Sequence, residues 1–214
     1  MVTVKSMNAT NFFSDSERET IRQAVQAAER TTSGEIATMV VDESDSYPEA
    51  ATLGAVLVAA LVGCIVSILI QHVTIWSYVP LVCILYFPAR FLFKVFPRLK
   101  LSFAGRRRIE EAVRERALRA FYEKGLYKTR EETGILIFLS LLEHKVWILG
   151  DRGINEKIPA GSWHTLASEL AAGIRESRAC DALVDVIAQC AKVLSENFPK
   201  REDDVDELSN ELLG

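Results

Sequence analysis

The strongest feature of the hydropathy pattern is a forty-residue stretch, Ala50 to Ala89, that contains no Asp, Glu, Lys or Arg. A helix needs about 20 apolar residues to cross the hydrocarbon core of a bilayer, so this stretch has room for two passes. Polar residues interrupt it at 71–78 and divide it into segments near Thr52–Ile70 and Trp76–Phe96. We interpret the pattern as a two-helix transmembrane hairpin. The alternative is a buried hairpin of a soluble protein, but core helices are usually shorter and carry a polar stripe.

The charged residues that flank this stretch predict its orientation. Seven cations follow it before the first acid, Glu110: Arg90, Lys94, Arg98, Lys100, Arg106, Arg107 and Arg108. Loops rich in Lys and Arg stay in the cytoplasm, whereas acids have little effect on orientation. Because both ends of a hairpin lie on one side, the residues before 50 and after 90 are expected to be cytoplasmic. The predicted location is therefore the inner or plasma membrane, with Trp76 and Tyr78 at the far interface.

Before the hairpin, the pattern predicts one helix and one strand. Ser14 and Glu17 form a capping-box sequence, and apolar residues recur behind them at helical spacing up to about Arg30. Residues 35–41 are rich in β-branched side chains and are followed by acids, which is typical of a buried strand that ends in a loop.

After the hairpin, the pattern predicts a helix, two strands and two more helices. Apolar residues recur every four positions from Ile109 to Phe121, which predicts a charged amphipathic helix over residues 103–124. Residues 135–139 are apolar on both faces, as a central strand is, and a turn at 143–145 leads into a second strand at 146–149. The sequence Gly150-Asp151-Arg152-Gly153 ends that strand. The closing helices are lined by Trp163, Leu166, Leu170 and Ile174, and by Leu183, Ile187, Cys190 and Leu194.

The strands on the two sides of the hairpin are expected to share one sheet, because a lone strand or strand pair cannot bury its apolar face. The hairpin is then an insertion in one domain, which a single pass could not be. We assign residues 1–49 and 98–199 to the two parts of this domain, 50–97 to the hairpin, and 200–214 to an acidic mobile tail. The predicted fold class is α/β: a sandwich of a small sheet flanked by helices, interrupted by a two-helix transmembrane hairpin.

Composition adds little to this picture. The net charge of −4 does not point to nucleic acid, and the Arg106–Arg108 run is more typical of a membrane-adjacent face. Cys180 and Cys190 fall ten residues apart on one predicted helix, too distant to bridge, and no C-x-x-C pair or His-rich cluster suggests zinc. Residues 1–11 lack the apolar core of a signal peptide.

Three motifs in the predicted domain resemble the TPM domain family. They are Thr32-Ser33-Gly34-Glu35-Ile36 before the first strand, a central hairpin with its glycine turn (Thr133 to Leu139, Lys145 to Ile148 and Gly150 to Ile154), and Arg175 to Leu183 before the last helix. The resemblance covers roughly residues 12–41 and 104–198. It implies an α/β sandwich with an acidic cleft at the strand ends. It also implies a function in metal binding, in hydrolysis of simple phosphate esters, or in upkeep of membrane complexes such as photosystem II.

The sequence departs from the family pattern at three positions. The aspartate that is usual near the start of the domain is not evident around Asn11-Phe12-Phe13. Thr133 stands where the family commonly has an acid or amide, with Glu131 and Glu132 just upstream. Ser177-Arg178-Ala179 replaces the usual Gly-Asp-Tyr-like turn before the last helix.

Asp151 and Arg152 are the candidate catalytic residues, because a tight turn at a strand end is a common place for ligand contacts. Asp151 with Glu132 could hold a divalent metal ion through oxygen ligands, and Arg152 could bind a phosphate bidentately. The alternative is that Asp151 stabilises the turn and Arg152 is solvated. A metal site would also be favoured if Glu131, Glu132, Asp151 and the acids of 42–45 converged.

Other polar residues are weaker candidates. Glu35 at the start of the first strand is interpreted as an exposed edge residue, and His72, His144 and His164 as single surface histidines. The chain has no Gly-rich phosphate loop, nucleophile elbow or His-Glu-x-x-His motif.

Two functional hypotheses remain. The first is a non-enzymatic, membrane-anchored module that docks on or maintains a membrane complex; its partners are the lipid bilayer and another membrane protein, not nucleic acid. The second is a metal-dependent phosphatase that acts on phosphate esters.

Overall fold

The protein is described here by a computed structural model that covers residues 8–71, 74–129, 131–159, 161–200 and 212. His72 and the predicted tail, apart from Lys200 and Leu212, lie outside these residues. The chain forms two compact units, one made of residues 1–44 and 113–214 and the other of residues 45–112. We call the first the α/β unit and the second the hairpin unit, and we describe each by itself.

The α/β unit is built on a three-stranded sheet with the order β1-β2-β3. The strands are β1 (Glu35–Val41), β2 (Gly134–Ser140) and β3 (Lys145–Gly150). β2 pairs parallel to β1 and antiparallel to β3. It is buried along its whole length, which confirms the central position predicted from its apolar run. The prediction that strands on both sides of the hairpin share one sheet is also confirmed.

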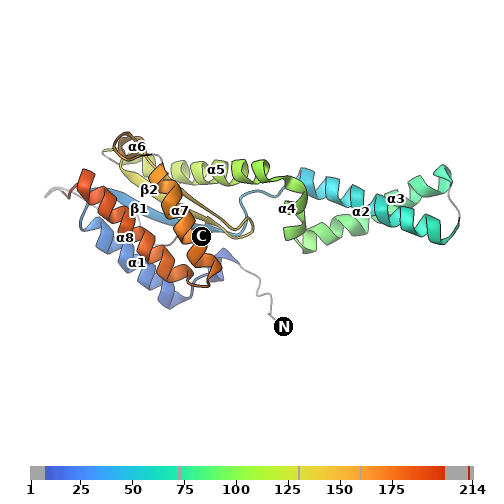
Figure 1. The fold of residues 1–214 in the computed structure, drawn as a ribbon, viewed down its shortest axis with the longest axis horizontal. Helices are drawn as coiled ribbons and strands as arrows, with labels where there is room; N and C mark the ends of the chain where they lie inside the picture. The colour runs from blue at the N-terminus through green and yellow to red at the C-terminus, as the bar shows by residue number, and fades with distance from the viewer. Residues whose placement is uncertain (1–7, 72–73, 130, 160, 201–211, 213–214) are drawn as a thin grey trace. The chain divides into compact units, whose positions relative to one another are not determined.

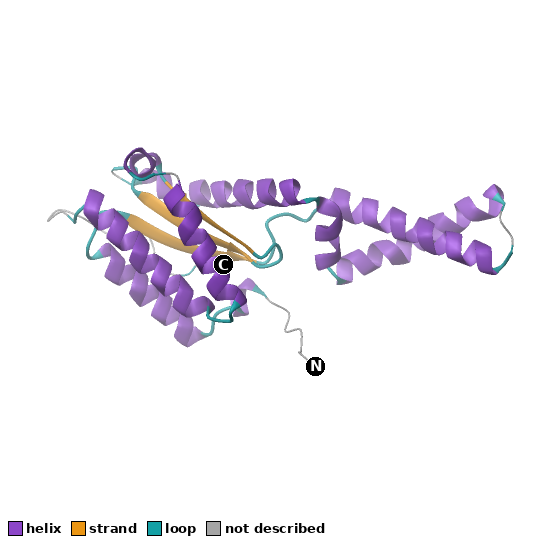
Figure 2. Cartoon of the chain, in the orientation of Figure 1, coloured by secondary structure: helices purple, strands orange, loops and turns teal. Residues whose placement is uncertain are grey.

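Helices cover both faces of this sheet (Figures 1 and 2). On one face α1 (Asp15–Glu29), α7 (Gly161–Arg175) and α8 (Ala179–Asn197) enclose the larger core, to which the sheet contributes Ile36, Val40, Ile135, Ile137, Leu139 and Ile148. On the other face the second half of α5 (Arg106–Glu123) packs on Ala37, Met39, Leu136 and Phe138. Successive strand residues thus alternate between two cores, as the two-residue period of a strand requires.

Side-chain hydrogen bonds fix the start of α1 and the end of α8. The Ser14 backbone N–H donates to Glu17 Oε2 at 2.8 Å, and the Glu17 N–H donates to Ser14 Oγ at 3.3 Å, so the predicted capping box begins α1. At the other end of the unit, the Thr32 hydroxyl donates to the Phe198 carbonyl at 2.7 Å and fixes the end of α8 beside the start of β1.

The hairpin unit contains α2 (Pro48–Leu69) and α3 (Ile75–Val95), which pack side by side. Small residues on α2, namely Ala51, Ala55 and Ala59, are buried against Ala89 and Phe93 of α3. A Cβ at Gly63 would lie 3.0 Å from Val82, and the Tyr78 hydroxyl donates to the Ala60 carbonyl at 3.0 Å. Small side chains therefore face the partner helix, while the large apolar ones face outward.

Both helices of the hairpin are long and apolar enough to cross a membrane. The most apolar 18-residue window has a mean hydropathy of 2.6 in α2 and 1.5 in α3. Only 28% of that window is buried in α2 and 11% in α3. A buried soluble hairpin, the alternative considered from the sequence, would hide most of this surface.

The helix predicted over residues 103–124 is wrong at its start. Gly105 has a positive φ of 74° and separates α4 (Arg98–Ala104) from α5. Phe103 belongs to α4, and the apolar spacing continued across the break because Phe103 and Ile109 pack into one cluster with Tyr47. Three short elements were also missed: α6 (Arg152–Lys157) and the 3₁₀ turns η1 (Ala9–Asn11) and η2 (Leu126–Lys128).

Candidate functional site

The candidate site begins where β3 ends. The Asp151 backbone N–H donates to the Gly134 carbonyl at 2.8 Å, which ties the end of β3 to the start of β2. The Asp151 side chain then caps α6, because its Oδ1 accepts the Arg152 backbone N–H at 2.7 Å. The residues predicted to form a glycine turn are therefore a strand end, a helix cap and the first turn of a helix.

Strand direction brings Glu131 and Glu132 to the same edge of the sheet as Asp151. They precede β2, whose first residues pair with the last residues of the antiparallel β3. The approach is close at Gly153, where a Cβ would lie 2.4 Å from the Glu131 carbonyl oxygen and 2.9 Å from that of Glu132. Only glycine fits there. Glu132 itself adopts a positive φ of 54°.

Glu35 begins β1 at this edge too, because β1 runs parallel to β2 and Glu35 pairs with Gly134. Its predicted exposure is wrong, since Glu35 is only 7% exposed. The strand has a helix layer on each face, so even its first residue is covered.

The acids of residues 42–45 lie away from this edge. Asp42 and Glu43 follow the opposite end of β1, where the Leu142 N–H donates to the Asp42 carbonyl at 2.9 Å. Asp45 is part of the hairpin unit and forms an ion pair with Arg108. Burial favours the protonated form of Asp45, but the hydrogen bond and charge of Arg108, together with backbone N–H donors of residues 46 and 47, lower the pKa of that carboxyl below its usual value.

The convergence that a metal site would need is therefore not seen. Within the described residues, no group of three or more His, Cys, Asp or Glu side chains is placed to hold a metal ion. His144 lies in the β2–β3 turn and His164 in the first turn of α7, and both are exposed, as predicted.

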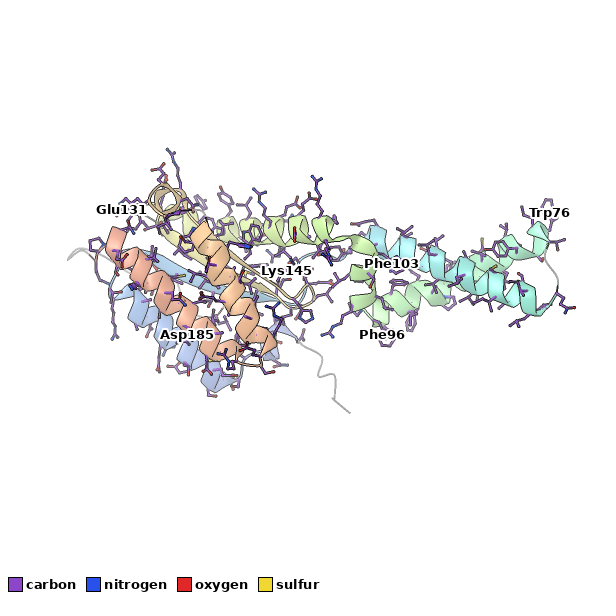
Figure 3. The ribbon with its side chains drawn as sticks, viewed as in Figure 1. Trp76, Phe96, Phe103, Glu131, Lys145 and Asp185 are labelled. Atoms are coloured by element: carbon purple, nitrogen blue, oxygen red, sulfur yellow. The ribbon has the colours of Figure 1, made fainter. Side chains whose placement is uncertain are left out.

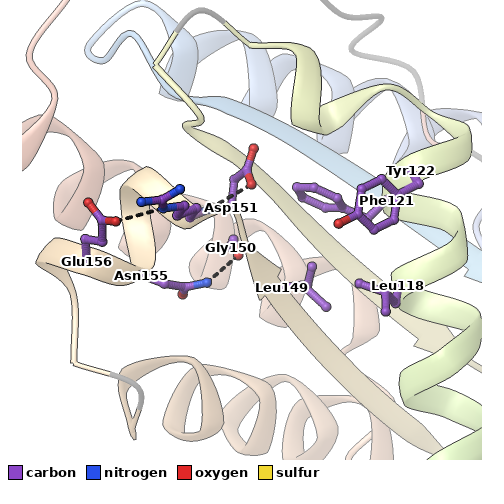
Figure 4. Close-up of a pocket in the computed structure, with 9 residues that line it drawn as sticks. Leu118, Phe121, Tyr122, Leu149, Gly150, Asp151, Asn155 and Glu156 are labelled. Carbon is purple, nitrogen blue, oxygen red and sulfur yellow. Dashed lines mark hydrogen bonds and ion pairs between the residues drawn. The ribbon is translucent and has the colours of Figure 1, made fainter.

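A cavity of about 500 Å³ lies beside Asp151 (Figure 4). Three elements form its walls: α5, the end of β3, and α6. One part is apolar and the other is polar; the lining residues are Leu118, Phe121, Tyr122, Leu149, Gly150, Asp151, Arg152, Asn155 and Glu156.

The polar side of the cavity is internally hydrogen-bonded. Arg152 Nε donates to Glu156 Oε1 at 2.9 Å, and this bond, with the negative charges of Glu156 and Glu132, raises the pKa of the guanidinium. Asn155 Nδ2 donates to the Gly150 carbonyl at 2.6 Å, while its Oδ1 accepts the Trp163 indole N–H at 3.1 Å. One polar atom stands apart: Asp151 Oδ2 is buried and has no hydrogen-bond partner among the described residues.

The structure thus places the predicted residues Asp151 and Arg152 in a cavity, with Glu132 at the same sheet edge. The apolar wall was missed. Leu118 and Tyr122 are four residues apart and lie one position after the core residues Ala117 and Phe121. This second, narrower apolar stripe on α5 was the available sequence signal.

Comparison with known proteins agrees with this architecture. Residues 103–193 match the family model of the TPM domain. The resemblance to the TPM domain family is confirmed over this segment. The match includes α5, the β2–β3 hairpin, α6, α7 and most of α8, and so contains the candidate site. It does not include β1 and α1, which were part of the predicted resemblance.

A solved structure supports the fold across both parts of the chain. The NMR structure of the BA42 protein from the psychrophilic bacterium Bizionia argentinensis superposes with a TM-score of 0.58. The two sequences are 21% identical, and the match covers 94% of each chain. A comparison with curated proteins found no match.

The close backbone approach at residue 153 leads to a first prediction. Gly153→Ala is expected to destabilise the protein by about 1–3 kcal/mol, because the added methyl group must push the Glu131 carbonyl away. Gly161→Ala is the matched control, since a Cβ there meets nothing within 4 Å. Thermal unfolding of the two variants in the same detergent measures the difference. Equal midpoints would mean that the 131–132 segment is free to move.

Proposed function

We propose that this chain is a membrane-anchored interaction module with a TPM-like α/β unit. In this proposal the hairpin crosses the inner or plasma membrane twice, and the α/β unit is cytoplasmic and docks on another membrane protein. The observation that carries the proposal is the outward apolar surface of α2 and α3, of which little is buried within the chain.

The membrane part of the proposal is supported by the distribution of side chains on the hairpin. Large apolar residues are exposed along both helices, among them Leu53, Leu57, Leu61, Ile65, Ile68, Ile84, Phe87 and Phe91. A contiguous apolar surface of this kind indicates contact with lipid or with another protein. The seven cations between residues 90 and 108 favour a cytoplasmic position for both ends.

The interaction part of the proposal rests on the cavity of the α/β unit. Leu118 and Tyr122 are 42% and 57% exposed although they lie beside a packed core. Aromatic residues are enriched where protein surfaces meet, and a polar rim around an apolar patch is the usual arrangement. The Arg152–Glu156 pair and Asn155 supply such a rim, and their hydrogen bonds hold it in place.

The predicted topology can be tested by labelling engineered cysteines in membrane vesicles. The sites are Ala27→Cys before the hairpin, Glu115→Cys after it and Trp76→Cys at its far end, and all three native residues are exposed. In a variant without the four native cysteines, a membrane-impermeant maleimide should label residues 27 and 115 from the cytoplasmic side. It should label residue 76 only from the other side. Labelling of 27 and 115 from opposite sides would contradict the proposal.

Photocrosslinking tests the docking surface. A photoreactive residue at Leu118 is expected to give one discrete crosslinked product with a membrane protein, whereas the same group at Ala27, on the helix layer that covers the other face of the sheet, should not. Tyr122→Ala should weaken that product about tenfold, because truncation of an aromatic anchor commonly costs more than about 1 kcal/mol. Products of equal yield from positions 118 and 27 would mean that the cavity is not the docking site.

A metal-dependent phosphatase is the second candidate function, and one observation favours it. The buried Oδ2 of Asp151 lacks a partner among the described residues, and the next residue, Arg152, lines the same cavity and carries an exposed guanidinium. A carboxylate oxygen suits a divalent cation, and a guanidinium suits a phosphate group. Asp151 and Glu132 would hold the metal, which would supply Lewis-acid activation when bound. Arg152 would orient the phosphate.

Turnover of p-nitrophenyl phosphate by the detergent-solubilised protein, with and without Mg²⁺, distinguishes the two candidates. We expect no turnover above that of an empty-vector preparation. Mg²⁺-dependent turnover that Asp151→Asn abolishes would instead establish the phosphatase. The substitution is informative because asparagine caps a helix as well as aspartate does, so α6 should be retained. Glu115→Gln, an exposed carboxylate of α5 that does not line the cavity, serves as the control and should leave any turnover unchanged.

A further inference from the structure

Four cations that begin or end helices at the base of the hairpin have no acidic partner among the described residues. Arg90 and Lys94 lie four residues apart on the last turns of α3, and Arg98 and Arg106 begin α4 and α5. Within the part of the chain that the structure describes, none of these four has an ion pair or side-chain hydrogen bond. Their neighbours differ: Arg107 pairs with Glu111 at 2.9 Å, and Arg108 pairs with Asp45 and Glu49.

Helix α4 is held against this end of the hairpin by aromatic packing. The rings of Phe103 and Phe93 meet edge to face with 5.5 Å between their centroids. Gly54 on α2 makes room for both, since a Cβ there would lie 2.4 Å from Phe93 and 3.0 Å from Phe103. Figure 3 shows Phe96 and Phe103 at this end of the hairpin and Trp76 at the opposite end.

The outward side of α4 combines exposed apolar and basic residues. None of its seven residues is buried; Leu99 is exposed, as is Phe96 just before the helix. Arg98 is exposed between them. An apolar surface flanked by cations is the pattern of a helix that lies in the headgroup region of a bilayer.

We propose that this basal surface, made of Arg90, Lys94, Arg98 and Arg106 with Phe96 and Leu99, binds the headgroups of anionic phospholipids. The inference rests on the proposed membrane insertion of the hairpin. Phe91 and Val95, which are exposed apolar residues of α3, directly follow Arg90 and Lys94 in the chain. A phospholipid could therefore place its acyl chain against the apolar residues and its headgroup against the cations. Unpaired cations at that depth attract the negative charge of such lipids. A soluble polyanion would leave the adjoining apolar residues exposed.

The experiment compares lipid retention by the full chain in uncharged detergent. Wild-type protein is incubated in mixed micelles with phosphatidylglycerol or phosphatidylcholine of the same acyl chains, and bound lipid is counted by native mass spectrometry. We expect several-fold greater retention of phosphatidylglycerol. The variant Arg90→Gln/Lys94→Gln/Arg98→Gln/Arg106→Gln should lose this preference.

The matched control removes four exposed cations from the α/β unit: Arg114→Gln/Arg119→Gln/Lys124→Gln/Lys192→Gln. It changes the net charge equally and should keep the preference for phosphatidylglycerol. Equal retention of the two lipids by the wild type, or an equal loss of preference in both variants, overturns the inference. Resistance of the wild-type protein to carbonate extraction from membranes reports separately on insertion. If it resists extraction but shows no lipid preference, only the basal surface is refuted.

Discussion

The parallel pairing of β1 with β2 is the interaction on which the rest of the structure depends. β2 lies between β1 and β3, and its side chains enter both cores of the α/β unit. Neither the part of the chain before the hairpin nor the part after it could bury these faces alone. Parallel neighbours require a long crossover, and here the crossover contains the whole hairpin unit together with α5. An insertion of two membrane passes is compatible with this pairing because it returns the chain to the side it left.

The same strand directions decide which acids can share a site. Glu35 begins β1 at the edge where β2 begins, and the antiparallel β3 ends there with Asp151. Asp42 follows the other end of β1 and is separated from Asp151 by the length of the sheet. The acids that could have formed one cleft are thus divided between the two ends of the strands. What remains at the Asp151 edge is a cavity with an apolar wall from α5 and a hydrogen-bonded polar rim from α6.

The two units differ in which side chains are buried and which are exposed. In the α/β unit, large apolar residues are inside and the exposed helix faces are charged, as the hydrophobic effect requires in water. In the hairpin unit, small residues such as Ala55 and Ala59 are inside and large apolar residues are outside. That arrangement lets the two helices approach closely and leaves their large apolar side chains exposed.

The sequence by itself determined the elements whose signals are local or strongly periodic. The capping box at Ser14, the apolar run of β2 and the uncharged hairpin needed no tertiary information, and their bounds agree with the structure to within a few residues. It also placed Asp151 and Arg152 at a strand end. Tertiary structure decided what these residues do there. Asp151 caps a six-residue helix with almost no periodicity to predict it, and Gly153 meets the Glu131 carbonyl only because β2 and β3 are antiparallel. Tertiary packing also decided the break at Gly105 and the burial of Glu35. The periodic apolar residues on the two sides of Gly105 pack into one cluster although the helix is interrupted, and Glu35 is covered by the helices on the faces of the sheet.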